Sequence, residues 1–394
     1  MIGASAYLAW RSVRAAWSRS ALLAAALGVA AGLPLVVGRA LDGVATAIGA
    51  RAQSTPLVAG PRGSPLDLCL RAMEFTLDDS GPAPVFAQKL LQPMQEHALV
   101  IPLALGARVR TTPVAGVPVE YFEFRALRAR EGRLPALLGE CVVGADAAAA
   151  LDLHAGGAVT TTPTQAYDVS GASPLRLHVV GVLARTGTAD DRAIFASLET
   201  AWTIAGIGHG HTELGTDAPL QLLLKKEAGH VQANASLREY EEVTPQTLAS
   251  FHFHGDPGDF PVSAAILVPP DARAAAILRG RADGAEAPLQ VARPAEVVDS
   301  LFARVFRVRE LLAWAFVAVL GAAAVVAALM LSLVVRMRAP ELALLARVGA
   351  PRGFVAAMLA WELAFVLAAA AACAAGLQAL APALEPLVRG WIGG

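Results

Sequence analysis

Three long apolar segments, separated by a large polar insertion, constrain the fold of this chain more than any other feature of its sequence. The segments are residues 21–37, 311–335 and 354–380. The first two carry no charged residue, and the third carries only Glu362. A membrane-spanning helix needs about 17–25 predominantly apolar residues. We therefore expect three spanning helices, the first at the short end of this range.

The composition supports a membrane protein with one large water-exposed domain. The 394 residues are 55% hydrophobic and 16% charged, whereas soluble domains usually carry about 25% charged residues. The deficit is concentrated from Leu311 onward, while residues 38–310 resemble an ordinary soluble domain. The net charge of −1 gives no reason to expect a nucleic-acid partner.

Basic residues orient the three segments, because cytoplasmic flanks carry an excess of arginine and lysine. They precede the first segment and lie between the second and third, at Arg11, Arg14, Arg19, Arg336, Arg338, Arg347 and Arg352. We therefore predict that residues 1–20 and 336–353 are cytoplasmic, and that residues 38–310 and the tail 381–394 lie outside. A cleaved signal peptide is the alternative for the first segment, but an uncleaved anchor fits the long N-terminal region better.

Two helices are expected to continue the spans outward. In residues 292–310 apolar side chains recur at helical spacing and no helix breaker precedes Leu311. Residues 39–53 show a similar but weaker pattern, interrupted by glycines. The two helices would form either a rigid stalk that carries motion or simple extensions that end just past the membrane.

The polar insertion is predicted to be an α+β domain, since short strands and helices alternate between glycine and proline turns. Strand-like runs occur at 98–105, 119–124, 140–143, 175–183, 220–224 and 264–268. Helical runs occur at 145–151, 194–204 and 271–279. Cys69 and Cys141 both fall in this domain, where either a disulfide or, more in keeping with two isolated cysteines, buried free thiols would fit.

A short amphipathic helix is predicted between the second and third spans, at residues 340–348. Pro340 suits a first helical turn, Glu341 suits the positive N-terminal end, and Gly349 suits the C-terminal stop. Leu342 and Leu345 share one face of this helix. The simplest alternative is an interfacial helix that only lies on the membrane.

The basic segment 336–353 resembles the segment between the second and third spans of FtsX/MacB-like ABC transporter permeases. Residues 131–133, 139–144 and 150–157 are similar, in order and spacing, to the extracytoplasmic core of MacB-type permeases. Residues 58–66 and 179–195 resemble one subgroup of that family. The family usually has four spans, so a fourth span has been lost, is missing from this sequence or comes from another chain.

The resemblance implies a function and partners. In the family, the short cytoplasmic helix is a coupling helix that docks on a cytoplasmic ABC ATPase, which binds the ATP. Carried to this chain, the docking residues are Glu341, Leu342, Leu345, Arg347 and Gly349. The resemblance also implies a multi-pass protein of the bacterial inner (cytoplasmic) membrane, working as a homodimer or as a heterodimer with another permease.

The chain itself is predicted not to be an enzyme. A phosphate-binding P-loop requires a Gly-Lys-Ser/Thr sequence, and no lysine here follows a glycine. No arrangement of nucleophile, base and acid stands out. The charged turn formed by Asp190, Asp191 and Arg192 is more typical of a surface or subunit contact than of an acid/base pair.

Two other features bear on binding. His209, His211, His252 and His254 alternate with other residues in two short segments, and alternation in a strand places side chains on one face. Histidines suit zinc, although a polar surface loop is the plainer interpretation. Glu362 interrupts a predicted span, where an ionisable group marks either a pairing with a neighbouring helix or a substrate or proton site.

Three hypotheses follow from these patterns. The first is a permease subunit that couples ATP hydrolysis by a separate ATPase to motion of the outer domain, for export or extraction of a substrate. The second is a non-transport mechanotransmitting adaptor that uses the same levers. The third is a membrane-anchored zinc-binding module, which is also the only hypothesis that gives this chain a cofactor of its own.

Overall fold

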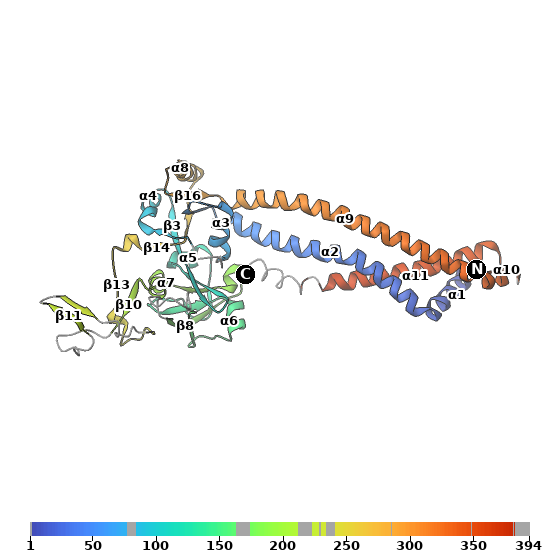
Figure 1. Cartoon of the computed structure of the whole chain (residues 1–394), viewed down its shortest axis with the longest axis horizontal. Coiled ribbons are helices and arrows are strands. Elements are labelled where there is room, and N and C mark those ends of the chain that lie inside the picture. The colour runs from blue at the N-terminus through green and yellow to red at the C-terminus, as the bar shows by residue number, and fades with distance from the viewer. Residues whose placement is uncertain are drawn as a thin grey trace. The chain divides into compact units, whose positions relative to one another are not determined.

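The computed structural model describes residues 2–76, 84–162, 174–211, 223–227, 230–233, 241–284, 286–347, 349–380 and 382. These residues form two compact units. Unit 1 combines the described parts of Met1–Ala47 and Ser300–Ile392, and unit 2 is formed by the described parts of Ile48–Asp299. Figure 1 shows the elements of both. The predicted tail 381–394 lies outside the described residues apart from Pro382.

Unit 1 is helical. Its helices are α1 (Ile2–Ala15), α10 (Ala339–Arg347), α11 (Arg352–Ala379) and the larger parts of α2 (Trp17–Gln53) and α9 (Pro294–Met337). The helices α2 and α9 each continue without a break into unit 2 (Figure 1). The predicted helical continuations of the first two spans are therefore confirmed. The helix α1 falls in the segment that we predicted only as a cytoplasmic N-terminus.

Three helices among the described residues are long and apolar enough to cross a membrane. The candidate spans are Trp17–Arg39, Trp314–Met337 and Gly353–Ala379, close to the segments predicted from the sequence. Large apolar side chains stand exposed along the first two, with Leu22 at 73% and Trp314 at 69%. Exposed apolar surface of this kind marks a membrane or a partner interface.

Glycines allow α2 to approach α11 closely. A Cβ atom at Gly28 would lie 2.7 Å from the Cβ of Cys373, and one at Gly32 would lie 3.0 Å from the Cα of Ala374. Small residues four apart on one helix face are typical of tightly packed membrane helices. A larger residue at either glycine would force the two helices apart.

Unit 2 is an α/β domain built on a mixed sheet that has ten strands within the described residues. In spatial order the strands are β16 (Leu289–Ala292), β1 (Leu57–Pro61), β15 (Ala264–Val268), β3 (Leu99–Val109), β4 (Thr112–Gly116), β9 (Ile194–Ala196), β6 (Glu140–Val143), β8 (Arg176–Leu183) and β5 (Ala129–Gly132), with β7 (Ala158–Thr160) also paired to β8. The pairs β4–β9 and β6–β8 are parallel, and the other pairs are antiparallel.

Shorter elements complete unit 2. Small two-stranded sheets pair β10 (Gly208–Gly210) with β13 (Phe251–Phe253), β11 (Leu223–Glu227) with β12 (His230–Ala233), and β2 (Phe86–Ala87) with β14 (Pro261–Val262). The α-helices are α3 (Pro65–Glu74), α4 (Gln92–Gln95), α5 (Val119–Phe124), α6 (Ala145–Leu151), α7 (Leu198–Ile204) and α8 (Ala272–Ala282). Single 3-10 turns are η1 (Gln88–Leu91), η2 (Ala189–Arg192), η4 (Leu248–Ser250) and η5 (Pro257–Asp259).

Both faces of the central strands are covered, which explains their continuous apolar runs. Val58 of β1 joins a core with side chains of α3 and α5, while its neighbours Leu57 and Ala59 join a second core with side chains of α7 and α8. Farther along the sheet, Val142 lies in the first core and Val143 in a third one. Successive residues of each strand therefore pack into hydrophobic cores on opposite faces of the sheet.

Two secondary-structure predictions were wrong. Residues 119–124 form the helix α5 rather than a strand, because a run of six residues is too short for its period to distinguish the two. Residues 194–204 form β9 and then α7, with the side chain of Ser197 accepting a hydrogen bond from the Thr200 amide at the helix start. The interpretation of Cys69 and Cys141 as buried free thiols agrees with the structure.

Candidate functional site

The predicted coupling helix is present as α10, and Gly349 follows it with φ of +97°. A glycine in this left-handed conformation is a common way to end a helix. The side-chain surroundings of Glu341, Leu342 and Leu345 lie outside the described part of the chain, while Arg347 is exposed. Docking of an ATPase on this helix stays a prediction.

Glu362 is buried within α11 and is paired. Its Oε1 atom lies 2.9 Å from Nη1 of Arg338, the residue between α9 and α10. The same Nη1 atom donates a 2.8 Å hydrogen bond to the hydroxyl of Ser12 on α1. These contacts support the interpretation that Glu362 pairs with a neighbouring segment, rather than the interpretation that it is a substrate or proton site. The contacts join three segments of unit 1.

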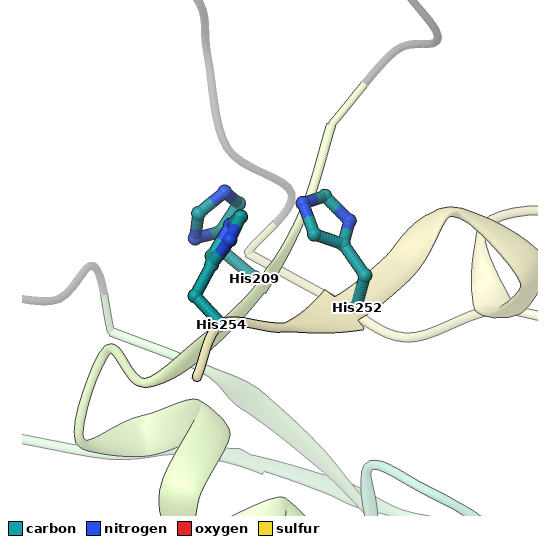
Figure 2. A group of neighbouring side chains, drawn as sticks. All are labelled: His209, His252 and His254. Carbon is teal, nitrogen blue, oxygen red and sulfur yellow. The ribbon is translucent and has the colours of Figure 1, made fainter. Parts of the chain in front are cut away.

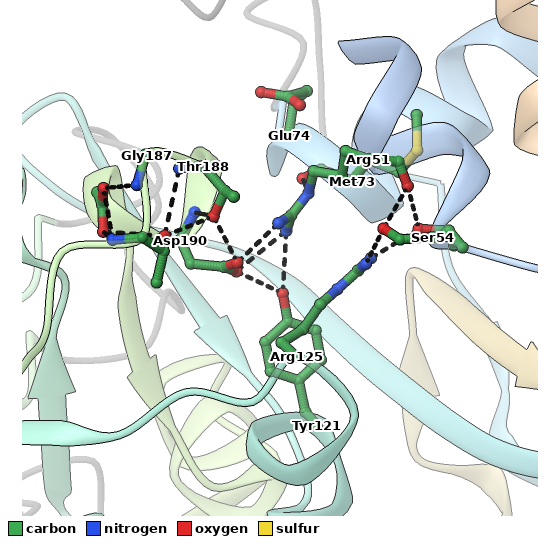
Figure 3. A network of polar contacts seen from close by, with 12 residues as sticks. Arg51, Ser54, Met73, Glu74, Tyr121, Arg125, Gly187, Thr188 and Asp190 are labelled. Carbon is green, nitrogen blue, oxygen red and sulfur yellow. Dashed lines mark hydrogen bonds and ion pairs between the residues drawn. The ribbon is translucent and has the colours of Figure 1, made fainter. Parts of the chain in front are cut away.

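A second buried ion pair lies in unit 2, at the end of α2. Arg51 and Asp190 form a two-pronged pair, with Nη1 of Arg51 2.6 Å from Oδ2 and Nη2 3.0 Å from Oδ1 (Figure 3). The hydroxyl of Tyr121 donates to Oδ1 of Asp190 at 2.6 Å. We call Arg51, Tyr121 and Asp190 the Arg51 cluster. Two-pronged arginine–carboxylate pairs are among the strongest hydrogen-bonded contacts in proteins.

Both carboxylate oxygens of Asp190 have hydrogen-bond partners. Asp190 also accepts a 2.8 Å hydrogen bond from the hydroxyl of Thr188, and Nε of Arg51 donates to the carbonyl of Met73 at 2.6 Å. Arg51 is 6% exposed, Asp190 is 2% exposed and Tyr121 is fully buried. A buried charge is tolerated when it is paired and hydrogen-bonded in this way.

The end of α2 is held by a second arginine as well. Nη2 of Arg125 donates to the hydroxyl of Thr55 at 2.8 Å, and Nη1 donates to the hydroxyl of Ser54 at 3.3 Å (Figure 3). Those two hydroxyls in turn donate to the carbonyl of Arg51, at 2.8 Å and 2.9 Å. The last turn of α2 is thus fixed through both its side chain and its backbone.

Burial and neighbouring charges both shift the pKa values of these groups. Burial alone would raise the pKa of Asp190, but attraction to Arg51 and the hydrogen bonds that it accepts bring that pKa below the ordinary value. Burial raises the pKa of Tyr121, and the negative charge of Asp190 adds to the effect. The aspartate is therefore ionised and the phenol neutral at physiological pH.

The turn that carries Asp190 is tightly packed within unit 2, whereas we predicted a surface or subunit contact. Asp191 is 1% exposed and its carboxylate accepts hydrogen bonds from the amides of Thr186 and Gly187, at 2.8 Å and 2.7 Å. A Cβ atom on Gly144 would lie 2.2 Å from the carbonyl oxygen of Asp190. Gly144 is therefore required for the turn to lie against β6 and α6.

The Arg51 cluster could not be predicted from sequence spacing, because its members are separated by more than sixty positions in every pair. The one available signal was compositional. Asp190 and Asp191 lie between a threonine-glycine-threonine turn at residues 186–188 and the apolar strand residues Ile194 and Phe195. Charged residues that adjoin a buried strand need partners from elsewhere in the fold.

The structure also brings the predicted histidines together. His209 of β10 lies directly opposite His252 of β13, and His254 follows β13 on the same side (Figure 2). The ring centroids are 4.9 Å apart for His209 and His252, and 4.8 Å apart for His252 and His254. The ring of His211 lies 5.0 Å from that of His252. We call these four residues the His cluster.

A scan of the sequence against protein-family models gave no match, and a search of the curated proteins gave none either. The resemblance to FtsX/MacB-like permeases therefore rests on the residues quoted for it.

The two clusters of unit 2 differ in what they can do chemically. In the Arg51 cluster the opposite charges pair with each other, so the cluster can fix the end of α2 within unit 2 but leaves no charged group for a ligand. The His cluster gathers groups of one kind, and imidazole nitrogens are ligands for transition metals.

Proposed function

We propose that this chain is the permease subunit of an ABC transporter in the inner membrane of a bacterial cell. A separate cytoplasmic ATPase binds and hydrolyses ATP. The chain converts the movement of that motor into movement of unit 2, which lies outside the membrane, and so drives export or extraction of a substrate. It works as a homodimer or together with another permease.

The observation that carries this proposal is the continuity of α2. The helix runs without interruption from the candidate span Trp17–Arg39 to Arg51, whose guanidinium is buried in unit 2 against Asp190. A helix that ended in an exposed, loosely held turn would dissipate a movement at that point. A helix whose last turn is clamped through a buried ion pair passes its movement on to the domain.

The helix α10 supplies the docking surface in this proposal. It is a short helix between two candidate spans, with arginines on either side. In this proposal the ATPase docks at the residues predicted from the sequence, which are Glu341, Leu342, Leu345, Arg347 and Gly349. The ion pair of Arg338 and Glu362, at the start of α10, connects the docking segment to α11.

Co-purification from membranes tests the proposal. The full-length chain is isolated from its native membranes, and the bound proteins are identified by mass spectrometry. We expect an ABC ATPase with the wild type and its loss in the double variant Leu342→Asp/Leu345→Asp. Leu344→Asp is the matched control, since it places the same charge on another face of the same helix and should retain the ATPase.

Absence of an ABC ATPase from the wild-type sample would exclude the proposal. Equal loss in the control variant would show that α10 was damaged rather than that a docking face was removed. An ATPase that binds without any ATP-dependent movement of substrate would favour the mechanotransmitting adaptor, for which the clamped helix α2 is equally suited.

A further inference from the structure

The His cluster sits on a ribbon whose two faces have different roles. The strands β10 and β13 read Gly-His-Gly and Phe-His-Phe, and Gly208 pairs with Phe253, His209 with His252 and Gly210 with Phe251. Since side chains alternate between the faces of a strand, the histidines share one face. The glycines and phenylalanines share the other.

The phenylalanine face fixes the ribbon to the body of unit 2. A Cβ atom on Gly208 would lie 2.4 Å from the ring of Phe253, and one on Gly210 would lie 2.5 Å from the ring of Phe251. Phe253 packs against the second core of unit 2 and Phe251 against the third. The glycines thus let two rings lie flat on the ribbon, and the rings hold it in place.

The histidine face brings ligand atoms to nearly the spacing that a metal requires. One ring nitrogen each of His209, His252 and His254 lies within 4.8 Å of the other two. Zinc-bound nitrogens lie about 2.0–2.1 Å from the ion, which places two of them about 3.3 Å apart in a tetrahedral site. Metal binding would require side-chain rotations that bring these nitrogens closer together. Figure 2 shows the three rings on one side of the ribbon.

One of the three rings is already set in the form that binds a metal. Nδ1 of His252 lies 2.9 Å from the backbone carbonyl oxygen of Ser250. A carbonyl only accepts hydrogen bonds, so Nδ1 carries the proton and the lone pair of the neutral ring is on Nε2. Metal-binding histidines are commonly oriented by a hydrogen bond of this kind from their second nitrogen.

We propose that His209, His252 and His254 form a site for a zinc ion. Three neutral imidazoles suit zinc and the other late first-row divalent metals, and not the oxygen-preferring magnesium and calcium. His211 lies beside the site, with its ring 5.5 Å from that of His209, and is placed to act as a fourth ligand. The site does not depend on the proposed transport function.

Zinc binding to the full-length protein in detergent tests this proposal. The protein is stripped with a chelator and titrated with zinc against a chromophoric competitor, with magnesium as the negative control metal. We expect one zinc per chain and a loss of affinity of at least about 10-fold in each of His209→Ala, His252→Ala and His254→Ala. His211→Ala should have a smaller effect, as expected of a ligand at the edge of the site.

His154→Ala is the matched control, because this exposed histidine of the same unit lies outside the cluster. It should bind zinc as the wild type does. To separate lost binding from lost folding, thermal unfolding is followed for each variant with and without zinc. Zinc should raise the melting temperature of the wild type and of His154→Ala, and not that of His252→Ala.

The proposal is overturned if the wild type binds no zinc at micromolar free metal, or if the three single variants keep wild-type affinity. Binding that is lost equally in His154→Ala would place the ion elsewhere and would overturn it as well. None of these results depends on whether an ATPase co-purifies with the chain.

Discussion

The Arg51 cluster and the His cluster are both built from polar side chains of unit 2, yet their chemistry is opposite. In the first, a cation, an anion and a phenol satisfy one another in a dry interior. In the second, four imidazoles gather on one face of a ribbon whose other face is apolar.

The difference indicates how each cluster contributes to function. Opposite charges that pair with each other stabilise the arrangement of the elements that carry them. Here they hold the last turn of α2 against α5 and the turn at Asp190. Imidazoles that converge on one point gain stability when a metal ion binds between them. The Arg51 cluster therefore acts as a rigid joint that fixes the last turn of α2 to the rest of unit 2, and the His cluster acts as a ligand site. The following predictions separate these two roles.

Removing one member of the joint should have the largest effect. Arg51→Met leaves Asp190 buried and ionised without its partner, and breaking a buried pair in this way typically costs about 3–5 kcal/mol. The free energy of unfolding, measured by denaturant titration of the detergent-solubilised protein, should fall by that amount.

Two further variants give this prediction its controls. Arg51→Met/Asp190→Leu removes both charges and should recover part of the loss, because no uncompensated charge remains. Arg279→Met breaks the solvent-exposed pair with Glu296 in the same unit and should change stability little. If Arg51→Met were no worse than Arg279→Met, the cluster would not be a structural joint.

Zinc should stabilise unit 2 independently of the joint. A ligand at 100 times its dissociation constant adds about 2.7 kcal/mol to the stability of the state that binds it. Because the two clusters share no side chain, Arg51→Met should show the same stabilisation by zinc as the wild type. A melting series with and without zinc measures this, and a zinc effect that disappeared in Arg51→Met would mean that the clusters are coupled.

Acid should weaken the joint. The pKa of Asp190 is lowered in the folded protein relative to the ordinary aspartate value of about 3.9. Its stabilising contribution is complete above the unfolded value and is lost as the pH falls through the folded one, with a slope of up to about 1.4 kcal/mol per pH unit. Denaturant midpoints measured from neutral pH to pH 3 should show this decline. Asp190→Asn should start lower and decline less steeply.

The glycines beneath the phenylalanines should have the smallest effect. Gly210→Ala pushes a methyl group against the ring of Phe251, a flexible side chain that can shift. We expect folding to be retained and zinc affinity to fall by a few-fold, as the ribbon tilts and the histidines lose their spacing. Gly280→Ala is the control, since a Cβ there meets nothing within 4 Å. Unchanged zinc affinity in Gly210→Ala would show that the apolar face does not position the site.

The sequence predicted what depends on local pattern. The apolar segments, the continuation of α2 and α9, the helix α10 and the alternating histidines all follow from periodicity within one stretch of chain. The alternation predicted that the two histidines within each segment share one strand face. It could not predict that β10 pairs with β13, which places His209 opposite His252.

The Arg51 cluster escaped prediction because it depends on tertiary contacts. No local sequence pattern indicates that its three residues contact one another. Arg51 lies in a helix, Tyr121 in a run that we predicted to be a strand, and Asp190 in a turn. The turn at Asp190 and Asp191 was predicted to be a surface or subunit contact from its charges alone. Its burial within unit 2 depends on Gly144, which leaves room for it.

The rigidity of the Arg51 cluster can be measured as a distance between two spin labels within unit 2. Cysteines replace Ala50 near the end of α2 and Ala150 on α6, both exposed, in a Cys373→Ser background. The native thiols of Cys69 and Cys141 should not react, because both are buried and burial raises the pKa of each to about 12.

The distance distribution is recorded by pulsed electron paramagnetic resonance in the complex with the ATPase, without nucleotide and with ATP bound. We predict one narrow distribution that is the same in both states, and a broad one in the Arg51→Met variant. A wild-type distance that broadened or shifted when ATP bound would show that α2 bends at Arg51, and that motion is not passed through this joint.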